Sequence, residues 1–138
     1  MIKTHQAGSQ FKGAIIASLS IPWGFSKGDN DIGGYHLIWP RDMVEAAGAL
    51  ISIGDDEDAV EALSYLRSTQ EADGHWPQNM WLDGNPYWHG IQMDETAFPV
   101  ILAYMLWKRD RIQLDDYIKM VRKAADYICL NGPATDQD

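Results

Sequence analysis

The stretch "AFPVILAYMLW", residues 97–107, is apolar around nearly its whole circumference if it forms a helix. A helix without a polar face is buried on most sides. Asp94 or Thr96 is a plausible N-cap in front of it, and Pro99 is tolerable only in the first turn of such a helix. We therefore predict a buried helix over these residues.

The neighbouring segments alternate between two kinds of predicted helix. Residues 42–53 are again apolar nearly all round, whereas residues 57–69 and 114–129 each carry one apolar stripe and one charged face. The order buried, striped, buried, striped is a weak internal repeat of about 50 residues. It predicts an all-α fold in two concentric layers, as an arc of an α/α barrel. The alternative is a four-helix bundle, in which every helix would carry a polar face.

Length, charge and cysteine content narrow the classes of function. The chain of 138 residues is the size of one modest domain, and as an arc of a larger barrel residues 1–138 are predicted to form only part of a domain. Its net charge of −9 argues against nucleic acid and anionic membranes as partners, and its apolar runs are too short to span a bilayer. The single Cys129 excludes an internal disulfide and a cysteine zinc cluster. The start "MIKTHQAGSQ" shows no signal peptide, so a cytoplasmic location is expected if Met1 is the true start.

A long connection separates the second and third predicted helices. It reads "QEADGHWPQNMWLDGNPYWHGIQMDE" over residues 70–95, and a loop of this length without its own secondary structure is usually functional. Amides and carboxylates alternate in it with aromatic residues: Trp76, Trp81, Tyr87, Trp88 and His89. Aromatic rings can cover the C–H faces of a pyranose while planar polar groups bind its hydroxyls, so the loop indicates sugar binding. Alternatively, the tryptophans close the end of the helical layer.

Four motifs resemble one enzyme family. They are "GAIIASLSIPWG" (13–24), "GGYHLIWPRDM" (33–43), "DGHWPQN" (73–79) and "YWHGIQMDETAFP" (87–99), and they resemble the bacterial glucoamylases and glucodextranases of glycoside hydrolase family 15. The resemblance implies an (α/α)6 barrel, of which this chain would supply about four of the twelve helices. It also implies inverting, exo-acting hydrolysis that releases β-glucose from the non-reducing ends of α-glucans. An α-glucan oligosaccharide is the expected partner, and no cofactor or metal is expected.

The resemblance assigns residues of the first pocket wall. Arg41 and Asp42 match the family's Arg-Asp pair that lines the terminal glucose pocket, and Tyr35 and Trp39 match aromatic residues that wall it. A guanidinium donates several hydrogen bonds in a rigid fork and a carboxylate accepts them. Together they could clasp the 4- and 6-hydroxyls that only a chain end presents. The plainer alternative is a helix-start ion pair with Asp42 as N-cap and Arg41 directed outward.

The opposite wall and the catalytic groups follow from the same resemblance. Trp88, Gln92 and Asp94 match the pattern W-x-x-x-Q-x-D. Asp94 and Glu95 are adjacent at a helix start and should point apart, so they are interpreted as pocket wall and N-terminal helix charge. Inverting hydrolysis needs two carboxyl groups about 6.5–9.5 Å apart. The resemblance places the general acid just after Asp138 and the base further on, so no catalytic residue is expected in this chain, and the isolated fragment should be inactive.

Two other classes of function share parts of the pattern. "YLRSTQEADGHW" (65–76) fits the Q-x(2–5)-G-x-W repeat of triterpene cyclases, and "DDED" (55–58) is similar to a magnesium-binding motif. Gln70 and Trp76 are interpreted as a structural device, and the four acidic residues as N-cap and dipole charges of the next helix. A non-catalytic carbohydrate-binding module is the second alternative. Both α-1,4 and α-1,6 linkages remain open.

Two further features concern ions and self-association. "KGDNDIGG" (27–34) could hold calcium through Asp29, Asn30 and Asp31, although a glycine-rich turn is favoured. An isolated arc would expose apolar inner-helix surface, for which we expect Phe98, Ile101, Leu102 and Met105. Exposed apolar patches drive association, so dimers or larger species are predicted.

Overall fold

The computed structural model describes residues 2–19 and 34–133. In chain order its elements are η1 (Ile2–His5), η2 (Ser9–Phe11), η3 (Gly34–His36), α1 (Pro40–Ser52), α2 (Asp56–Thr69), β1 (Asn79–Met80), β2 (Pro86–Trp88), α3 (Met93–Lys108) and α4 (Leu114–Asn131). The four α-helices are those predicted from the sequence. The suggested calcium ligands Asp29, Asn30 and Asp31 lie outside the described residues.

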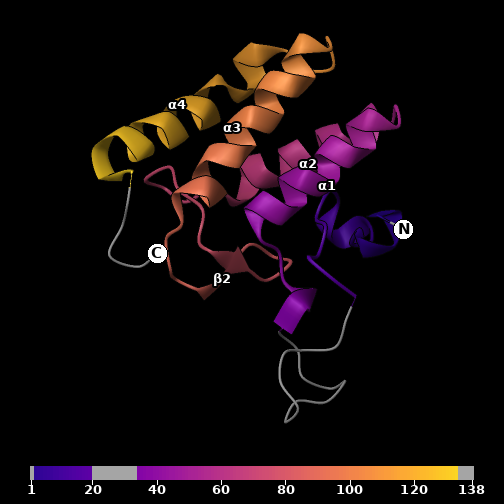
Figure 1. Ribbon diagram of the computed structural model, residues 1–138, viewed down its shortest axis with the longest axis horizontal. Helices are drawn as coiled ribbons and strands as arrows, with labels where there is room; N and C mark the ends of the chain where they lie inside the picture. Colours follow the sequence, from indigo (N-terminus) through magenta and orange to yellow (C-terminus); the bar gives the residue numbers. More distant parts are fainter. Residues whose placement is uncertain (1, 20–33, 134–138) are drawn as a thin grey trace.

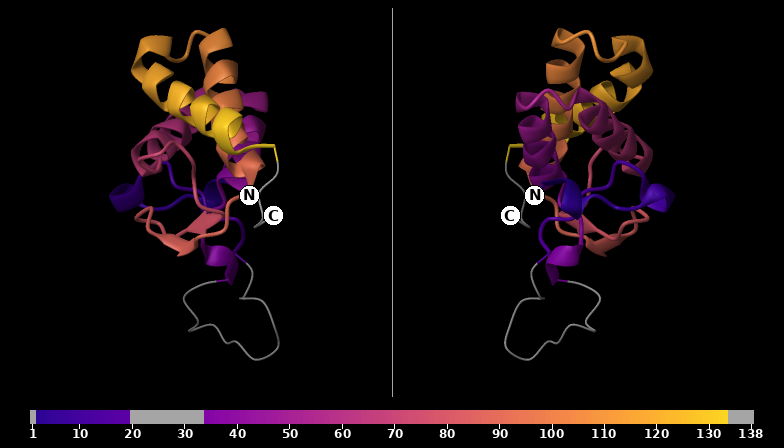
Figure 2. Two further views of the ribbon diagram at one scale, coloured as in Figure 1. Left: turned by 90° about the vertical axis from the view of Figure 1, so that its left-hand side faces the viewer. Right: turned by 90° about the vertical axis from the view of Figure 1, so that its right-hand side faces the viewer.

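The four α-helices form two hairpins that pack side by side. α1 packs against α2 and α3, and α3 packs in addition against α4. The turns within the two hairpins lie at one end of the helical layers, and the small β-hairpin lies at the other end, where α1 and α3 begin (Figures 1 and 2). The predicted position of the aromatic loop at one end of the helices is therefore confirmed.

α1 begins at Pro40, two residues earlier than predicted. Proline suits the first helical position because its missing N–H would have no intrahelical partner there. It also disfavours helical backbone in the preceding residue, and Trp39, the N-cap, is extended with φ −104° and ψ 122°. Asp42 is thus inside the first turn of α1, and the alternative that made it the N-cap is wrong.

α3 begins at Met93, which also differs from the prediction. Gln92 is the N-cap, while Asp94 and Thr96 both lie within the first turn. Pro99 consequently lies in the second turn of α3, so the expectation that it is tolerable only in the first turn is wrong. The proline costs the helix one backbone hydrogen bond, but it is buried, and the packing of α3 against three other helices keeps the helix continuous.

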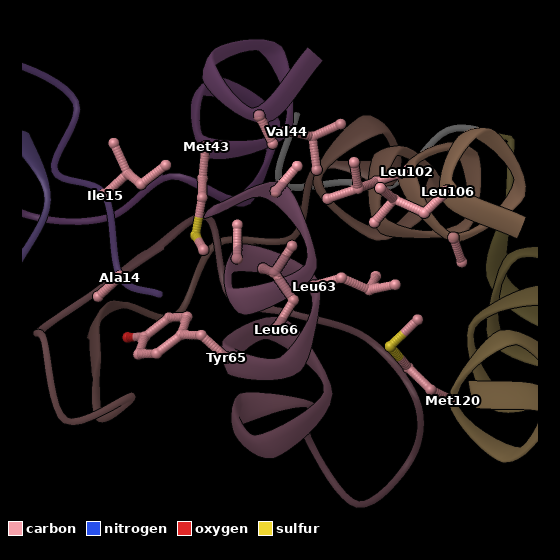
Figure 3. Close-up of a cluster of buried hydrophobic side chains, with 14 of the residues drawn as sticks. Ala14, Ile15, Met43, Val44, Leu63, Tyr65, Leu66, Leu102, Leu106 and Met120 are labelled. Atoms are coloured by element: carbon pink, nitrogen blue, oxygen red, sulfur yellow. The ribbon is translucent and has the colours of Figure 1, made fainter. Parts of the chain in front are cut away.

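One apolar core joins the helices. It contains residues from every α-helix and from the N-terminal segment, among them Ala14, Ile15, Met43, Val44, Leu63, Leu66, Leu102, Leu106 and Met120 (Figure 3). Full burial of a leucine or methionine contributes about 1.5–3 kcal/mol. This shared core fixes the two hairpins relative to each other, and with them the beginnings of α1 and α3.

The exposed face of α3 differs in part from the expectation. Ile101 is 48% exposed, as predicted, but Leu102 is fully buried in the core. Phe98 and Met105 are partly buried against that core. The exposed apolar residues that the prediction did not name are Tyr104 and Trp107. The error arises because a helix with no polar face gives no sequence signal of which side meets its neighbours.

The long loop has secondary structure of its own, which the sequence did not predict. β1 and β2 pair antiparallel, and Met80 of β1 also pairs with Ile38. The Ile38 N–H donates to the Met80 carbonyl at 2.9 Å, and the Met80 N–H donates back at 3.0 Å. Since Ile38 stands just before α1, this bridge fixes the aromatic loop beside the start of that helix.

Three further features of the described residues concern membrane spans, metal-binding clusters and Cys129. Within residues 2–19 and 34–133, no helix is both long and apolar enough to cross a lipid bilayer. The same residues contain no group of three or more His, Cys, Asp or Glu side chains placed to hold a metal ion. Cys129 is exposed and carries a free thiol.

Candidate functional site

Arg41, in the first turn of α1, lies among three carboxyl groups. Its Nη1 donates to Asp94 Oδ2 at 2.7 Å, and its Nη2 is 3.4 Å from Asp42 Oδ2 and 3.7 Å from Glu95 Oε1. The hydrogen bond to Asp94, with the charges of Glu95 and Asp42, holds the pKa of the Arg41 guanidinium above its ordinary value against the effect of burial. Arg41 therefore points toward α3, and the alternative that directed it outward is wrong.

Glu95 is the buried member of this cluster. Its side chain is 0% exposed, and its Oε2 accepts the backbone N–H of Arg41 at 2.6 Å. Burial raises the pKa of Glu95 to about 8, although the hydrogen bond and charge of Arg41 act in the opposite direction. Burial therefore favours the protonated form of this carboxyl group, and Arg41 opposes that effect.

The contact between Glu95 and Arg41 is also a helix cap. The first N–H groups of a helix have no intrahelical acceptor, and the N-cap residue of α1, Trp39, makes no side-chain cap bond. A carboxyl group from the first turn of α3 supplies the missing acceptor. The sequence prediction that Glu95 is an N-terminal charge of its own helix is correct in position, but it missed this contact with another helix.

The aromatic residues predicted for the first wall, Tyr35 and Trp39, lie just before α1. The rings of Tyr35 and Trp39 are 6.0 Å apart between centroids and tilted by 36°. Tyr35 is 42% exposed, whereas Trp39 is only 8% exposed. Tyr35 is thus partly exposed at the surface, and its ring lies beside that of the more buried Trp39.

The residues predicted for the opposite wall include Trp88, which belongs to the β-hairpin. Trp88 is 43% exposed, and its backbone N–H donates to Oδ1 of the fully buried Asn79 at 3.0 Å. Its ring lies 5.8 Å from that of Tyr87, at a tilt of 42°. Asn79 therefore fixes the backbone of Trp88 from the interior. Gln92 stands at the N-cap position of α3 without a side-chain cap bond, and its Oε1 is buried without accepting a hydrogen bond from the protein.

The structure thus brings the predicted site residues to one end of the helices. Arg41 contacts both Asp42 and Asp94. Trp88 is linked to the segment before α1 through the backbone, because its N–H donates to Asn79 and the next residue, Met80, pairs with Ile38. The site combines two segments more than 40 residues apart in the chain, which sequence spacing alone could not show.

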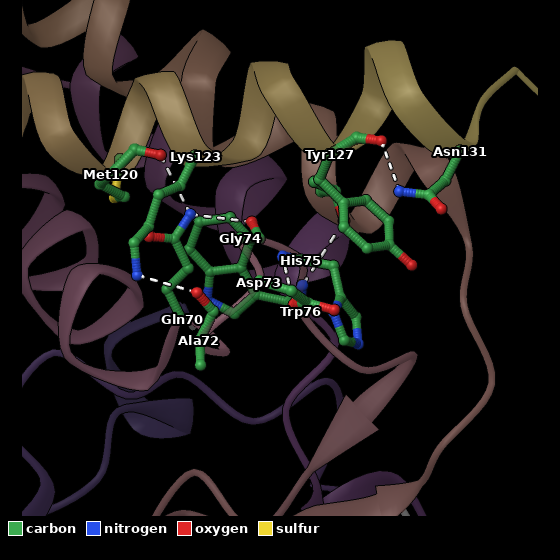
Figure 4. Close-up of polar contacts among 11 residues, drawn as sticks. Gln70, Ala72, Asp73, Gly74, His75, Trp76, Met120, Lys123, Tyr127 and Asn131 are labelled. Atoms are coloured by element: carbon green, nitrogen blue, oxygen red, sulfur yellow. Dashed lines mark hydrogen bonds and ion pairs between the residues drawn. The ribbon is translucent and has the colours of Figure 1, made fainter.

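Gln70 and Trp76 have the structural role predicted for them. Gln70 Nε2 donates to the carbonyl oxygens of Gly74 at 2.8 Å and of Met120 at 3.0 Å, linking the end of α2 to α4 (Figure 4). Trp76 is fully buried, and its indole N–H donates to the Leu66 carbonyl at 3.0 Å. Both side chains are occupied in packing, which leaves the cyclase-like repeat without a chemical role here.

The acidic run 55–58 is likewise engaged in the fold. Asp56 is 4% exposed and accepts hydrogen bonds from Arg109 at 3.0 Å and Arg111 at 2.7 Å. Asp55 and Asp58 pair with Lys3. A magnesium site would need these oxygens to be open, so this motif indicates helix-start charges and ion pairs, as the sequence interpretation had it.

One cavity lies beside the Arg41 cluster, and another lies beside the acidic run 55–58. One of about 180 Å³ lies beside Asp42, with a mostly apolar lining that includes Ile15 and Ala46. A larger one of about 620 Å³ lies at the other end of α1, lined by Asp56, Glu57 and Arg111 among others. The larger cavity contains none of the predicted site residues, so cavity size does not indicate the site in this chain.

Comparison with known proteins finds related sequences. The family model of "Glycosyl hydrolases family 15" matches residues 2–75. A glucoamylase of Clostridium sp. (strain G0005) is 48% identical over 127 residues, covering 92% of this chain and 17% of the relative. An uncharacterized glycosyl hydrolase of Methanocaldococcus jannaschii is 30% identical over 104 residues, covering 70% of this chain and 16% of the relative.

A solved structure supports the same assignment. The crystal structure of a bacterial glucoamylase complexed with acarbose matches with a TM-score of 0.83 and 45% identity, over 97% of this chain and 19% of that chain. Fold and matches together place the chain among the glycoside hydrolase families, and the four helices are confirmed as part of an (α/α)6 barrel. The chain belongs to glycosyl hydrolase family 15. It spans about a sixth of the length of the curated relatives that it matches.

Proposed function

We propose that this chain forms one wall of the glucose pocket in an exo-acting, inverting α-glucosidase that releases β-glucose from the non-reducing ends of α-glucans. The observation that carries the proposal is the Arg41 cluster. One guanidinium is fixed at 2.7 Å by Asp94, while Asp42 is held only at 3.4 Å with its side chain 42% exposed. Asp42 can therefore accept from a sugar hydroxyl while Arg41 donates to another.

The exposed aromatic rings suit the same ligand. Tyr35 and Trp88 each keep about two-fifths of their surface open. The ring of Tyr35 lies beside that of the more buried Trp39, and the backbone of Trp88 is fixed by the buried Asn79. A rigid ring at the surface can cover the C–H face of a pyranose at little entropic cost. The bacterial glucoamylase of similar structure was crystallised with acarbose, which supports an α-linked oligosaccharide as the ligand.

The two proton-transfer groups are proposed to lie outside these 138 residues. Asp94 is paired with Arg41, and Glu95 has no exposed surface, so neither is free to meet a scissile bond. General acid or base catalysis is worth about 10²–10⁴-fold per group. The chain alone should therefore release no detectable glucose from maltose or isomaltose. Robust release would return the catalytic assignment to Asp94 and Glu95.

Binding calorimetry with maltotriose, acarbose and the β-linked control cellotriose tests the proposal. We expect the chain to bind the two α-linked ligands and not cellotriose. Asp42→Asn and Trp88→Ala should each weaken binding by about tenfold or more, equivalent to about 1.4 kcal/mol. Gln70→Ala, whose target lies in the helical packing, should leave the affinity unchanged. Equal binding of cellotriose, or no effect of either site variant, would contradict the proposal.

A further inference from the structure

Glu95 contacts Arg41 twice. Its Oε2 accepts the Arg41 backbone N–H at 2.6 Å, and its Oε1 lies 3.7 Å from the Arg41 Nη2. The first contact fixes the backbone from which the Arg41 side chain extends, and the second faces the end of that side chain. The buried Glu95 therefore contacts both the backbone and the guanidinium of Arg41, the residue that is proposed to bind sugar.

Glu95 also connects Arg41 to its exposed partner. The backbone N–H of Glu95 donates to Asp94 Oδ1 at 2.9 Å, while Asp94 Oδ2 accepts from Arg41 Nη1 at 2.7 Å. The two consecutive acidic residues at the start of α3 thus hold the guanidinium from two sides. The expectation that adjacent side chains of a helix start point apart does not prevent them from meeting one extended arginine.

Packing alone does not explain a carboxyl group at this position. A buried ionisable group is costly, and an apolar side chain of similar size is often at least as stabilising. One oxygen of Glu95 is moreover buried without a hydrogen bond, which adds to the cost. The carboxyl group is explained by what it holds, namely the first turn of α1 and the guanidinium.

We propose that Glu95 is the positioning residue of Arg41, and that its protonation state sets how Arg41 is shared between Glu95 and Asp94. This inference rests on the proposed function, in which Arg41 binds a sugar hydroxyl. The charged groups that face the Glu95 carboxyl are Arg41 and Asp42 from α1 and Asp94 from α3. While Glu95 is neutral, Arg41 is paired with Asp94. When Glu95 ionises, its charge attracts the guanidinium inward, away from Asp94.

The consequence is an alkaline loss of sugar affinity. The raised pKa of about 8 for Glu95 places this change between neutral and mildly alkaline pH. The inward attraction should weaken the proposed sugar contacts of Arg41 as the pH rises through that value.

The test compares the chain with Glu95→Gln and Glu95→Ala. Glutamine keeps an acceptor for the Arg41 N–H but cannot ionise, whereas alanine provides no acceptor. The first readout, the amide proton shift of Arg41 by NMR from about pH 5 to 9.5, needs no ligand. We expect a titration near pH 8 in the parent chain, a flat downfield shift in Glu95→Gln, and an upfield shift in Glu95→Ala. Glu45→Gln, an exposed change on α1, should match the parent chain.

The second readout is the affinity for acarbose at about pH 6.5 and pH 9. We expect Glu95→Ala to bind acarbose about tenfold more weakly than the parent chain. Glu95→Gln should bind like the parent chain at the lower pH, and its affinity should fall less than that of the parent chain at the higher pH. An unchanged Arg41 amide in both variants, or an equal alkaline loss in Glu95→Gln, would overturn the positioning role. If Arg41 responds as expected but the parent chain binds no sugar, the link holds and the proposed function fails.

Discussion

Gln70 Nε2 lies 3.0 Å from the Met120 carbonyl oxygen, so one side chain at the end of α2 bonds the middle of α4. The same nitrogen donates to the Gly74 carbonyl at 2.8 Å. This amide thus connects both helical hairpins and the first turn of the aromatic loop, at a place where no proposed sugar ligand lies.

Gln70→Ala should lower stability without affecting the sugar site. Two hydrogen bonds are lost and two carbonyl groups lose a donor, which costs about 1–3 kcal/mol in total. Denaturant unfolding measures this cost, and acarbose calorimetry measures the site. Gln70→Glu, which keeps the size but offers an acceptor in place of the donor, should be at least as destabilised. A large loss of affinity with unchanged stability would contradict the structural role.

Gly74→Ala should be more damaging than its size suggests. Gly74 has φ +110°, and a Cβ placed on it would overlap the backbone carbonyl of Lys123 in α4. We expect a loss of about 2 kcal/mol or more, because both the backbone and α4 must shift. Gly48→Ala is the matched control. It lies within α1 with nothing within 4 Å of the added Cβ, so it should stabilise by up to about 1 kcal/mol. Equal effects of the two changes would show that α4 does not approach Gly74 closely.

Glu95→Gln should stabilise the fold in a pH-dependent manner. The folded-state pKa of Glu95, about 8, lies above the ordinary value of 4.5, so the folded chain binds more protons than the unfolded chain between these values. The free energy of unfolding of the parent chain should therefore fall as pH rises through this window. The variant lacks that loss, and its advantage should grow up to about pH 8 and then level off, at a few kcal/mol.

Thermal unfolding of both proteins from about pH 5 to pH 9 measures this difference. Glu45→Gln, an exposed change on α1, provides the control and should give a nearly constant difference from the parent chain. An advantage of Glu95→Gln that is independent of pH would mean that Glu95 is ionised throughout.

The exposed face of α3 should make the chain self-associate, as we propose from its three large apolar residues, Ile101, Tyr104 and Trp107. Exposed apolar patches of this kind favour association. Sedimentation velocity should show concentration-dependent dimers or larger species, and Ile101→Lys combined with Tyr104→Lys should shift them to monomers. Ile53→Lys, at an exposed position after α1, should leave association unchanged. A parent chain that stays monomeric would contradict this prediction.

Helix periodicity predicted most of the fold, because apolar and charged faces leave a strong signal. The boundaries of α2 and α4 agree with the prediction to within two residues. The starts of α1 and α3 were placed too late, since Pro40 is favoured at the first helical position and Met93 has no capping signal of its own. β1 has only two residues and β2 three, too few for an alternating pattern to be detected.

The sequence predicted the residues of the candidate site but not the contacts that hold them in place. Family motifs named Arg41, Asp42 and Asp94, and the structure places them in contact; their role in sugar binding stays a prediction. The burial of Glu95 and of Asn79 could not be foreseen, because both follow from how the loop and α3 pack against α1. A polar residue gives the same letter in a sequence whether it faces water or the interior.

Because Glu95 of α3 caps the first turn of α1, the order of that turn depends on the stability of the whole fold. The acceptor for the Arg41 N–H comes from a helix that begins more than 50 residues later in the chain, so the first turn of α1 is completed only when both hairpins have docked. Arg41 should therefore belong to the same cooperative unit as the core, and its amide hydrogen should exchange with solvent mainly through global unfolding. Both hairpins together therefore hold Arg41, the residue proposed to bind the sugar. Core mutations that lower the stability of the chain should also raise the fraction of time for which Arg41 is out of place.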